Sequence, residues 1–144
     1  MEYAGGGELS DWVKKNQGLS EIQTRDIILQ ITLAMQACHA VGVVHRDLKL
    51  ENVLFDESKT RIKVVDFGIA GLVTTVRADK NTAATLKYMT PEMILSSSSV
   101  ASPAMDVWAI GIMAYTMMFY KMPFSGANKE ETQKAITTQE VQLP

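Results

Sequence analysis

Residues 45–52 read His45-Arg46-Asp47-Leu48-Lys49-Leu50-Glu51-Asn52, and nineteen residues after Asp47 the chain reads Asp66-Phe67-Gly68. These two stretches supply a carboxylate, a cation two residues further on, and two oxygen donors of the kind that hard metal ions prefer. Phosphoryl transfer from a metal nucleotide requires such a set, because its catalysis is mostly positioning and charge neutralisation. The two stretches are therefore candidate active-site segments.

The residues between these segments predict a β-hairpin. The runs 52–55 and 62–65 are rich in apolar, strand-forming residues, and the polar run 56–60 between them has the composition of a turn. Antiparallel pairing would bring Asn52 and Asp66 to the same end of the hairpin, as a shared metal site requires.

Periodicity and capping signals predict mainly helices around the hairpin. Ser10 or Asp11 would cap a short helix over 10–17, and Ser20 with Gln23 forms a capping box for a helix over 21–40. Pro91 would start a single turn, and Asn128 would cap a last polar helix over about 129–138. Residues 102–106 open a helix that continues through the apolar run 107–120 and, being apolar on nearly all sides, should be fully buried.

Two irregular stretches carry their own signals. Gly5, Gly6 and Gly7 indicate a flexible backbone or a close approach of two backbone segments. Residues 68–90 have weak periodicity and many small or polar side chains, which predicts a long functional or mobile loop.

Composition suits one ordinary soluble domain, with 47% hydrophobic and 21% charged residues among 144. The net charge of -2 does not indicate a nucleic-acid partner, and the longest apolar run, 14 residues over 107–120, is too short to cross a membrane. No secretory signal is visible, and the single cysteine, Cys38, fits a reducing compartment. We therefore expect a cytoplasmic location.

The candidate segments occur in a pattern that resembles the eukaryotic protein kinases. Residues 45–52, 66–68 and 90–92 are similar to the family's catalytic loop, metal-binding triplet and Ala-Pro-Glu motif. Residues 106–111 and 123–126 resemble later motifs, and residues 1–9 resemble the hinge that joins the two kinase lobes. Because six motifs follow the family's order across the whole chain, chance is a poor explanation.

This resemblance implies an α+β fold, namely the mainly helical C-terminal lobe of a kinase with a small catalytic β-hairpin. Residues 1–144 would be a partial kinase domain made of hinge, catalytic loop, activation segment and central buried helix. The family's N-terminal lobe, which carries the glycine-rich loop and the phosphate-gripping lysine, and its last C-terminal helices would lie outside these residues. Ala84 and Thr90 depart from the family's usual glycine and alanine.

The resemblance also assigns roles in catalysis and metal binding. Asp47 would accept or orient the proton of the substrate hydroxyl, and Lys49 would neutralise charge on the transferring phosphate. Asn52 and Asp66 would hold Mg²⁺ through oxygen. Taken singly, Asp47 and Asp66 could equally be solvated turn residues, and only the register of the motifs favours the catalytic roles.

Further residues would bind the cofactor, ATP. The backbone of Glu2 and Ala4 would meet the adenine, and Leu54 would pack beneath it. Glu8 and Glu51 match family positions that contact the ribose or a basic residue of the substrate. Paired carboxylates at the edge of a cleft would attract such a basic residue. An alternative is that both are ordinary exposed glutamates.

The implied partners are a protein substrate with a serine or threonine hydroxyl and an upstream activating kinase. Lys49 is typical of serine/threonine kinases, and the pattern is similar to calcium/calmodulin-dependent and related kinases. Arg46 would dock a phosphorylated residue of the activation loop, for which Thr82 is the first candidate, followed by Thr74 and Thr75. An unphosphorylated polar loop remains the alternative.

Two functions of different class are open at this point. The chain belongs either to a complete serine/threonine kinase or to a truncated, non-catalytic kinase-like interaction module. The intact set of Asp47, Lys49, Asn52 and Asp66 favours the kinase, whereas the missing phosphate-gripping half favours the module. For the isolated chain we expect weak nucleotide binding without turnover.

Overall fold

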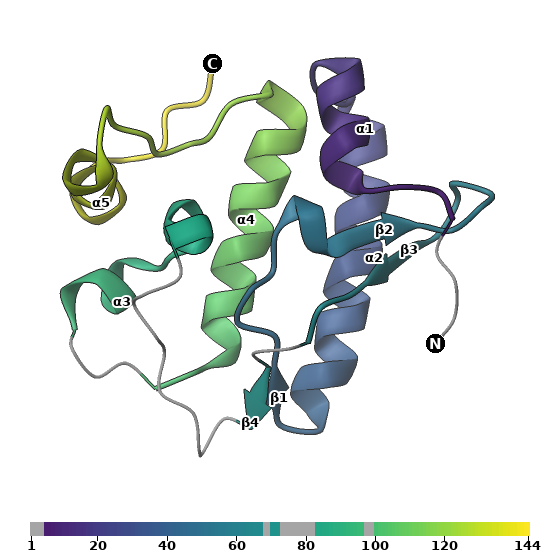
Figure 1. The fold of residues 1–144 in the computed structure, drawn as a ribbon, viewed down its shortest axis with the longest axis horizontal. Coiled ribbons are helices and arrows are strands. Elements are labelled where there is room, and N and C mark those ends of the chain that lie inside the picture. The colour runs from purple at the N-terminus through teal and green to yellow at the C-terminus, as the bar shows by residue number, and fades with distance from the viewer. Residues whose placement is uncertain (1–4, 68–69, 73–82, 97–99) are drawn as a thin grey trace.

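Two long helices, α2 (Glu21–Ala40) and α4 (Pro103–Phe119), form the centre of the computed structural model, which describes residues 5–67, 70–72, 83–96 and 100–144. They run side by side in Figure 1, with α1 (Leu9–Asn16) and the hairpin of β2 (Val53–Phe55) and β3 (Ile62–Val64) beside α2. The elements α3 (Pro91–Leu95) and α5 (Lys129–Thr138) lie on the α4 side. The described part is thus mainly helical with small antiparallel sheets, as predicted.

Helix α2 forms as the sequence predicts. The Ser20 side chain accepts a hydrogen bond from the backbone N–H of Gln23, whose own side chain accepts one from the backbone of Ser20. Its apolar side chains Ile27, Ile31 and Met35, which recur at helical spacing, are buried. This stripe joins one core with α1, the hairpin and α4.

Helix α1 begins one residue earlier than predicted. Glu8 is its N-cap and makes no side-chain capping bond, so the prediction of Ser10 or Asp11 as cap is wrong. The Ser10 hydroxyl instead donates to the Glu8 carboxylate at 2.8 Å. The helix is held by packing, because Leu9 and Val13 are buried in the core.

The predicted hairpin is confirmed, with Val53 paired to Val64 and Phe55 to Ile62. The carboxylate of Asp56 fixes its turn by accepting hydrogen bonds from Ser58, Thr60 and Arg61. Asn52 differs from the prediction, since it ends the 3₁₀ turn η1 (Leu50–Asn52) rather than starting the strand.

The described part of the stretch predicted as a long loop contains two regular elements. The short strand β4 (Gly71–Leu72) pairs with β1 (Val43–Val44), and η2 (Ala83–Tyr88) is a 3₁₀ helix. A two-residue strand has no alternation that a sequence pattern could reveal. The candidate phosphosites Thr74, Thr75 and Thr82 lie outside the described residues.

The start of α3 at Pro91 and the cap of α5 at Asn128 are confirmed. Pro91 is the first residue of α3, and Thr90, which was not predicted as a cap, accepts a hydrogen bond from the N–H of Met93. Asn128 caps α5 by accepting from the N–H of Glu131 at 2.8 Å.

Helix α4 is not fully buried, contrary to the prediction. Its inner side carries Met113 and Met117, which are inaccessible to solvent, but Val107 on the other side is 62% exposed. Together with Trp108, Tyr115 and Phe124, Val107 lines an open apolar groove of about 330 Å³. None of the helices formed by the described residues is long and apolar enough to span a membrane.

We predict that Ile31→Ala lowers the free energy of unfolding by about 2–5 kcal/mol, because it leaves a cavity in the shared core. Leu33→Ala is the matched control, because Leu33 lies on the same helix and is 54% exposed. This control should change the free energy by no more than about 0.5 kcal/mol. Urea unfolding measures both variants, and equal losses would show that this core does not hold α2.

Candidate active site

The backbone of the catalytic loop is held by one buried carboxylate. Asp106 on α4 is 1% exposed and accepts hydrogen bonds from the backbone N–H groups of His45, at 2.9 Å, and Arg46, at 3.0 Å. His39 on α2 lies 2.7 Å from the same carboxylate. Arg46 adopts a left-handed backbone conformation, φ 72°, which the two anchored N–H groups hold in place. Asp106 therefore fixes the direction in which the chain leaves β1.

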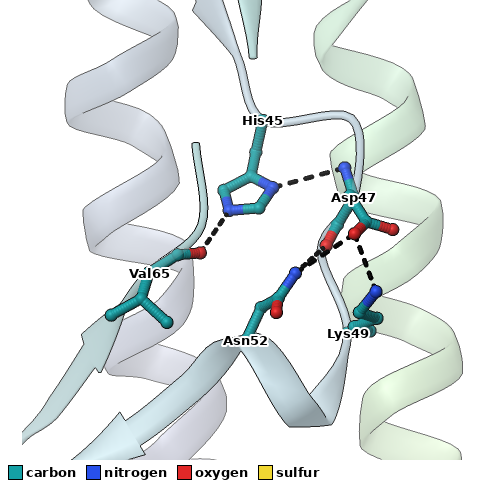
Figure 2. A network of polar contacts seen from close by, with 5 residues as sticks. All are labelled: His45, Asp47, Lys49, Asn52 and Val65. Atoms are coloured by element: carbon teal, nitrogen blue, oxygen red, sulfur yellow. Dashed lines mark hydrogen bonds and ion pairs between the residues drawn. The ribbon is translucent and has the colours of Figure 1, made fainter. Parts of the chain in front are cut away.

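His45 ties this loop to the end of the hairpin. Its ring is fully buried and lies between the two segments, as Figure 2 shows. The N–H of Asp47 donates to His45 Nδ1 at 3.3 Å, so the other ring nitrogen carries the proton and donates to the Val65 carbonyl at 3.0 Å. The ring of Phe67 packs on His45 with a centroid separation of 4.6 Å.

Three of the predicted side chains meet in one hydrogen-bonded group, which is visible in Figure 2. Lys49 Nζ lies 2.7 Å from Asp47 Oδ2. Asn52 Nδ2 donates to the Asp47 carbonyl at 2.8 Å and to Asp47 Oδ2 at 3.3 Å. Both charged side chains keep some solvent contact, 13% for Asp47 and 17% for Lys49. The carboxylate is thus oriented from two sides and still accessible to a bound hydroxyl group.

Asn52 and Asp66 lie at the same end of the hairpin, as predicted. The N–H of Val65 donates to the backbone carbonyl of Asn52 at 2.9 Å, and Asp66 follows directly in the chain. Because Asn52 uses its amide nitrogen on Asp47, its side-chain oxygen has no hydrogen-bond donor among the described residues. Asp66 is exposed and left-handed, with φ 62°. An oriented amide oxygen and an exposed carboxylate suit Mg²⁺, which takes few protein ligands and completes its shell with water and phosphate.

The described residues contain no cluster of three or more His, Cys, Asp or Glu side chains that could hold a metal ion. A cation at the hairpin end would therefore depend on the pair Asn52 and Asp66 and on phosphate oxygens.

The structure brings together some of the residues that were predicted to bind the nucleotide. Residues 5–8 run beside β2, where Glu8 bridges to Leu54 and Gly6 donates its N–H to the Phe55 carbonyl at 3.0 Å. A side chain at position 6 would collide with the backbone of Asp56, which explains the glycine. Glu8 and half-buried Leu54 are thus neighbours, whereas Glu2 and Ala4 lie outside the described residues.

Comparison with known proteins decides the family. Residues 1–144 match the sequence model of the protein kinase domain along their whole length. The chain belongs to the protein kinase family. It is 38% identical over 144 residues to human NUAK family SNF1-like kinase 1, covering 100% of this chain and 22% of that protein. It is 35% identical to a probable serine/threonine-protein kinase, MARK-A of Dictyostelium discoideum, covering 100% of this chain and 13% of that protein.

The kinase chain thus spans about a fifth of the length of the NUAK kinase. A third relative, another probable serine/threonine-protein kinase of Dictyostelium discoideum, is 38% identical over 145 aligned residues, which cover 31% of its length. Two of these three relatives are named as probable serine/threonine-protein kinases, and the resemblance predicted from the motifs is confirmed at the level of the family.

Tyr88 is a contributor to the site that sequence reasoning missed. It lies between the catalytic loop and α4, where burial raises the pKa of its hydroxyl to about 12, assisted by the negative charges of Glu51 and Asp47. A hydrogen bond from the backbone of Leu50 acts in the opposite direction. Folding therefore favours the neutral form of the Tyr88 hydroxyl.

Asp106 and His39 were also not singled out. A carboxylate directly before the apolar run of α4 was the available signal, because a buried charge requires hydrogen-bond partners. Nothing in the sequence pattern identified which backbone groups those partners would be.

We predict that the chain loses stability between about pH 10 and pH 12. The unfolded state would ionise Tyr88 near pH 10 and the folded state near 12, so stability should fall as pH rises, by about 3 kcal/mol in total. Tyr88→Phe should remove this decline, and Tyr120→Phe, at a tyrosine that is 46% exposed, should leave it. Urea unfolding at several pH values measures the slope, and an unchanged slope in Tyr88→Phe would contradict the assignment.

We also predict that Asp106→Asn lowers the free energy of unfolding by about 2–4 kcal/mol, because one backbone N–H must lose its charged acceptor. Amide hydrogen exchange at His45 and Arg46 should become faster. Asp26→Asn is the control, since the Asp26 side chain is 59% exposed and its hydrogen-bond partner among the described residues is the neighbouring Arg25. If exchange at the two loop amides does not change, Asp106 is not their anchor.

Proposed function

We propose that residues 1–144 form the catalytic part of a serine/threonine protein kinase domain. The proposed reaction moves the terminal phosphoryl group of Mg-ATP to a serine or threonine hydroxyl of a protein. The observation that carries this proposal is the group of Asp47, Lys49 and Asn52, in which one carboxylate is oriented beside an ammonium and an amide whose oxygen is left over for a cation.

Each side chain has one task in the proposed reaction. Asp47 accepts the proton of the substrate hydroxyl as the hydroxyl oxygen bonds to phosphorus. Lys49, 2.7 Å from that carboxylate, places a positive charge where the phosphoryl group passes. Asn52 and Asp66 offer oxygen ligands to Mg²⁺ at the end of the hairpin. ATP supplies the phosphoryl group and Mg²⁺ neutralises its charge, with ADP as the leaving group.

The adenine end would lie along the segment that pairs with β2. In this proposal the backbone of Glu2 and Ala4 meets the base, Leu54 packs beneath it, and Glu8 approaches the ribose. The bridge between Glu8 and Leu54 supports a common position for the last two. Glu51, on η1, would face the protein substrate.

The finer classification is also part of the proposal. We place residues 1–144 in the C-terminal lobe of a kinase that is similar to calcium/calmodulin-dependent and related kinases, with the N-terminal lobe supplied by residues outside this range. Lys49 supports a serine/threonine rather than a tyrosine acceptor. An upstream kinase would phosphorylate the activation segment, with Thr82 as first candidate and Arg46 as the docking cation. We expect the enzyme to act in the cytoplasm.

A second candidate function is a non-catalytic interaction module. The open apolar groove beside α4, with Val107 62% exposed, favours it, because contiguous exposed apolar surface commonly marks a contact site. The in-frame coding sequence upstream of residue 1 separates the two candidates. A glycine-rich loop and a strand lysine there would support the kinase, and an in-frame stop would support the module.

We predict that Asp47→Asn reduces phosphoryl transfer by about 10²–10⁴-fold, because the substrate proton loses its acceptor. The experiment uses the longest protein that carries residues 1–144, a serine peptide and labelled ATP. ATP affinity should stay unchanged, and Asp11→Asn, an exposed position on α1, should retain full activity. Turnover by the Asp47→Asn protein at the unmodified rate would exclude Asp47 as the base.

The isolated chain 1–144 gives a separate readout. We expect it to bind ATP weakly and not to turn over, since the phosphate-gripping groups of the family are proposed to lie outside it. Steady phosphoryl transfer by purified 1–144 would overturn the proposed division of the domain.

A further inference from the structure

A cavity of about 430 Å³ opens directly beyond the catalytic loop. Four elements enclose it: Leu50 and Glu51 come from η1, Lys87 and Tyr88 from η2, Thr116 from α4, and Thr132 from α5. Its size falls within the range of about 300–1,000 Å³ that is usual for ligand pockets. Leu50 follows Lys49 in the chain, so whatever fills the cavity lies next to the proposed phosphoacceptor.

Most of the polar groups of this cavity are already engaged within the chain. The Thr116 hydroxyl donates to the Ile112 carbonyl at 2.8 Å, and the Thr132 hydroxyl donates to the Asn128 carbonyl at 2.9 Å. The phenol of Tyr88 is hydrogen-bonded to the backbone of Leu50. The charged side chains are therefore the polar groups of this cavity that would recognise a ligand.

The two charges that line the cavity have opposite signs. Glu51 and Lys87 are both exposed, and the ion pairs among the described residues do not include one between them. Glu51 and Asp47 both raise the pKa of Tyr88, so the wall near the catalytic loop lies in a negative field. Lys87, on the η2 side, supplies the positive end. Such a cavity suits a segment that carries one basic and one acidic side chain rather than a purely basic one.

We propose that this cavity binds the part of the protein substrate that flanks the phosphoacceptor, and that Lys87 is a specificity-determining residue that selects an acidic side chain there. Glu51 selects the basic side chain expected from the sequence. The inference rests on the proposed kinase function for the identity of the ligand. It goes beyond that function by naming a dipolar substrate segment and the residue that reads its negative end.

The test measures binding and does not need catalysis. Fluorescence anisotropy follows labelled peptides with a central serine as they bind the 144-residue chain. In this set a single glutamate occupies each flanking position in turn and is compared with glutamine at the same position. At one position we expect glutamate to bind about two- to fivefold more tightly than glutamine. High salt should reduce this preference, because the charges are exposed.

Variants identify the residue responsible. Lys87→Glu should reverse the preference at that position, so that glutamine binds more tightly than glutamate. Lys15→Glu makes the same charge change at an exposed site on α1 outside the cavity and should leave the preference as it is. Glu51→Gln should weaken binding of peptides with a lysine near the acceptor and retain the glutamate preference. Circular dichroism checks that each variant is folded.

Three results of the binding test would overturn the inference: no position that prefers glutamate, a preference that survives in Lys87→Glu, or no peptide binding at millimolar concentration. Failure of the kinase function gives a different pattern. In that case the peptide preference depends on Lys87 while the longest protein that carries residues 1–144 transfers no phosphate. Phosphoryl transfer that is indifferent to both the peptide glutamate and Lys87→Glu would reject the inference and keep the function.

Discussion

The candidate active site depends on the hydrogen bonds that the Asp106 carboxylate accepts from the backbone N–H groups of His45 and Arg46. A buried carboxylate is unfavourable unless its oxygens are satisfied, and here two backbone donors and His39 satisfy them. The consequence is geometric. The catalytic loop is tied to the middle of the molecule at one point, where the left-handed turn at Arg46 directs Asp47 toward the hairpin. The proposed base is therefore positioned by α4, an element almost sixty residues away in sequence.

The sequence predicted those parts of the fold whose determinants are local. The capping box of α2, the helix start at Pro91, the cap at Asn128 and the hairpin turn at Asp56 all depend on residues close together in the chain, and all are present. The predicted start of α1 was wrong because the packing of Leu9, rather than a capping side chain, sets that boundary.

The parts that the sequence missed depend on contacts between distant segments. Strand β4 exists only through its pairing with β1, and the incomplete burial of α4 depends on which elements pack against it. The same distinction applies to the site. Motif spacing indicated that Asn52 and Asp66 share one end of the hairpin, but it contained no information on Tyr88, whose hydroxyl meets the catalytic loop from η2. The binding residues Glu2 and Ala4 remain predictions.

The buried and the exposed charged side chains have different roles in the proposed site. Asp106 is buried and fully hydrogen-bonded, so changing it would move the backbone of the loop. Asp47 and Lys49 are only partly exposed and hold each other at 2.7 Å, so a bound phosphate meets a preoriented pair with little reorganisation. Glu51 and Lys87 are exposed and line the adjacent cavity, where changing them would alter the choice of ligand but not the fold. Substitutions at Glu51 or Lys87 could therefore change which ligand is selected without changing the geometry of the catalytic loop, which Asp106 on α4 holds.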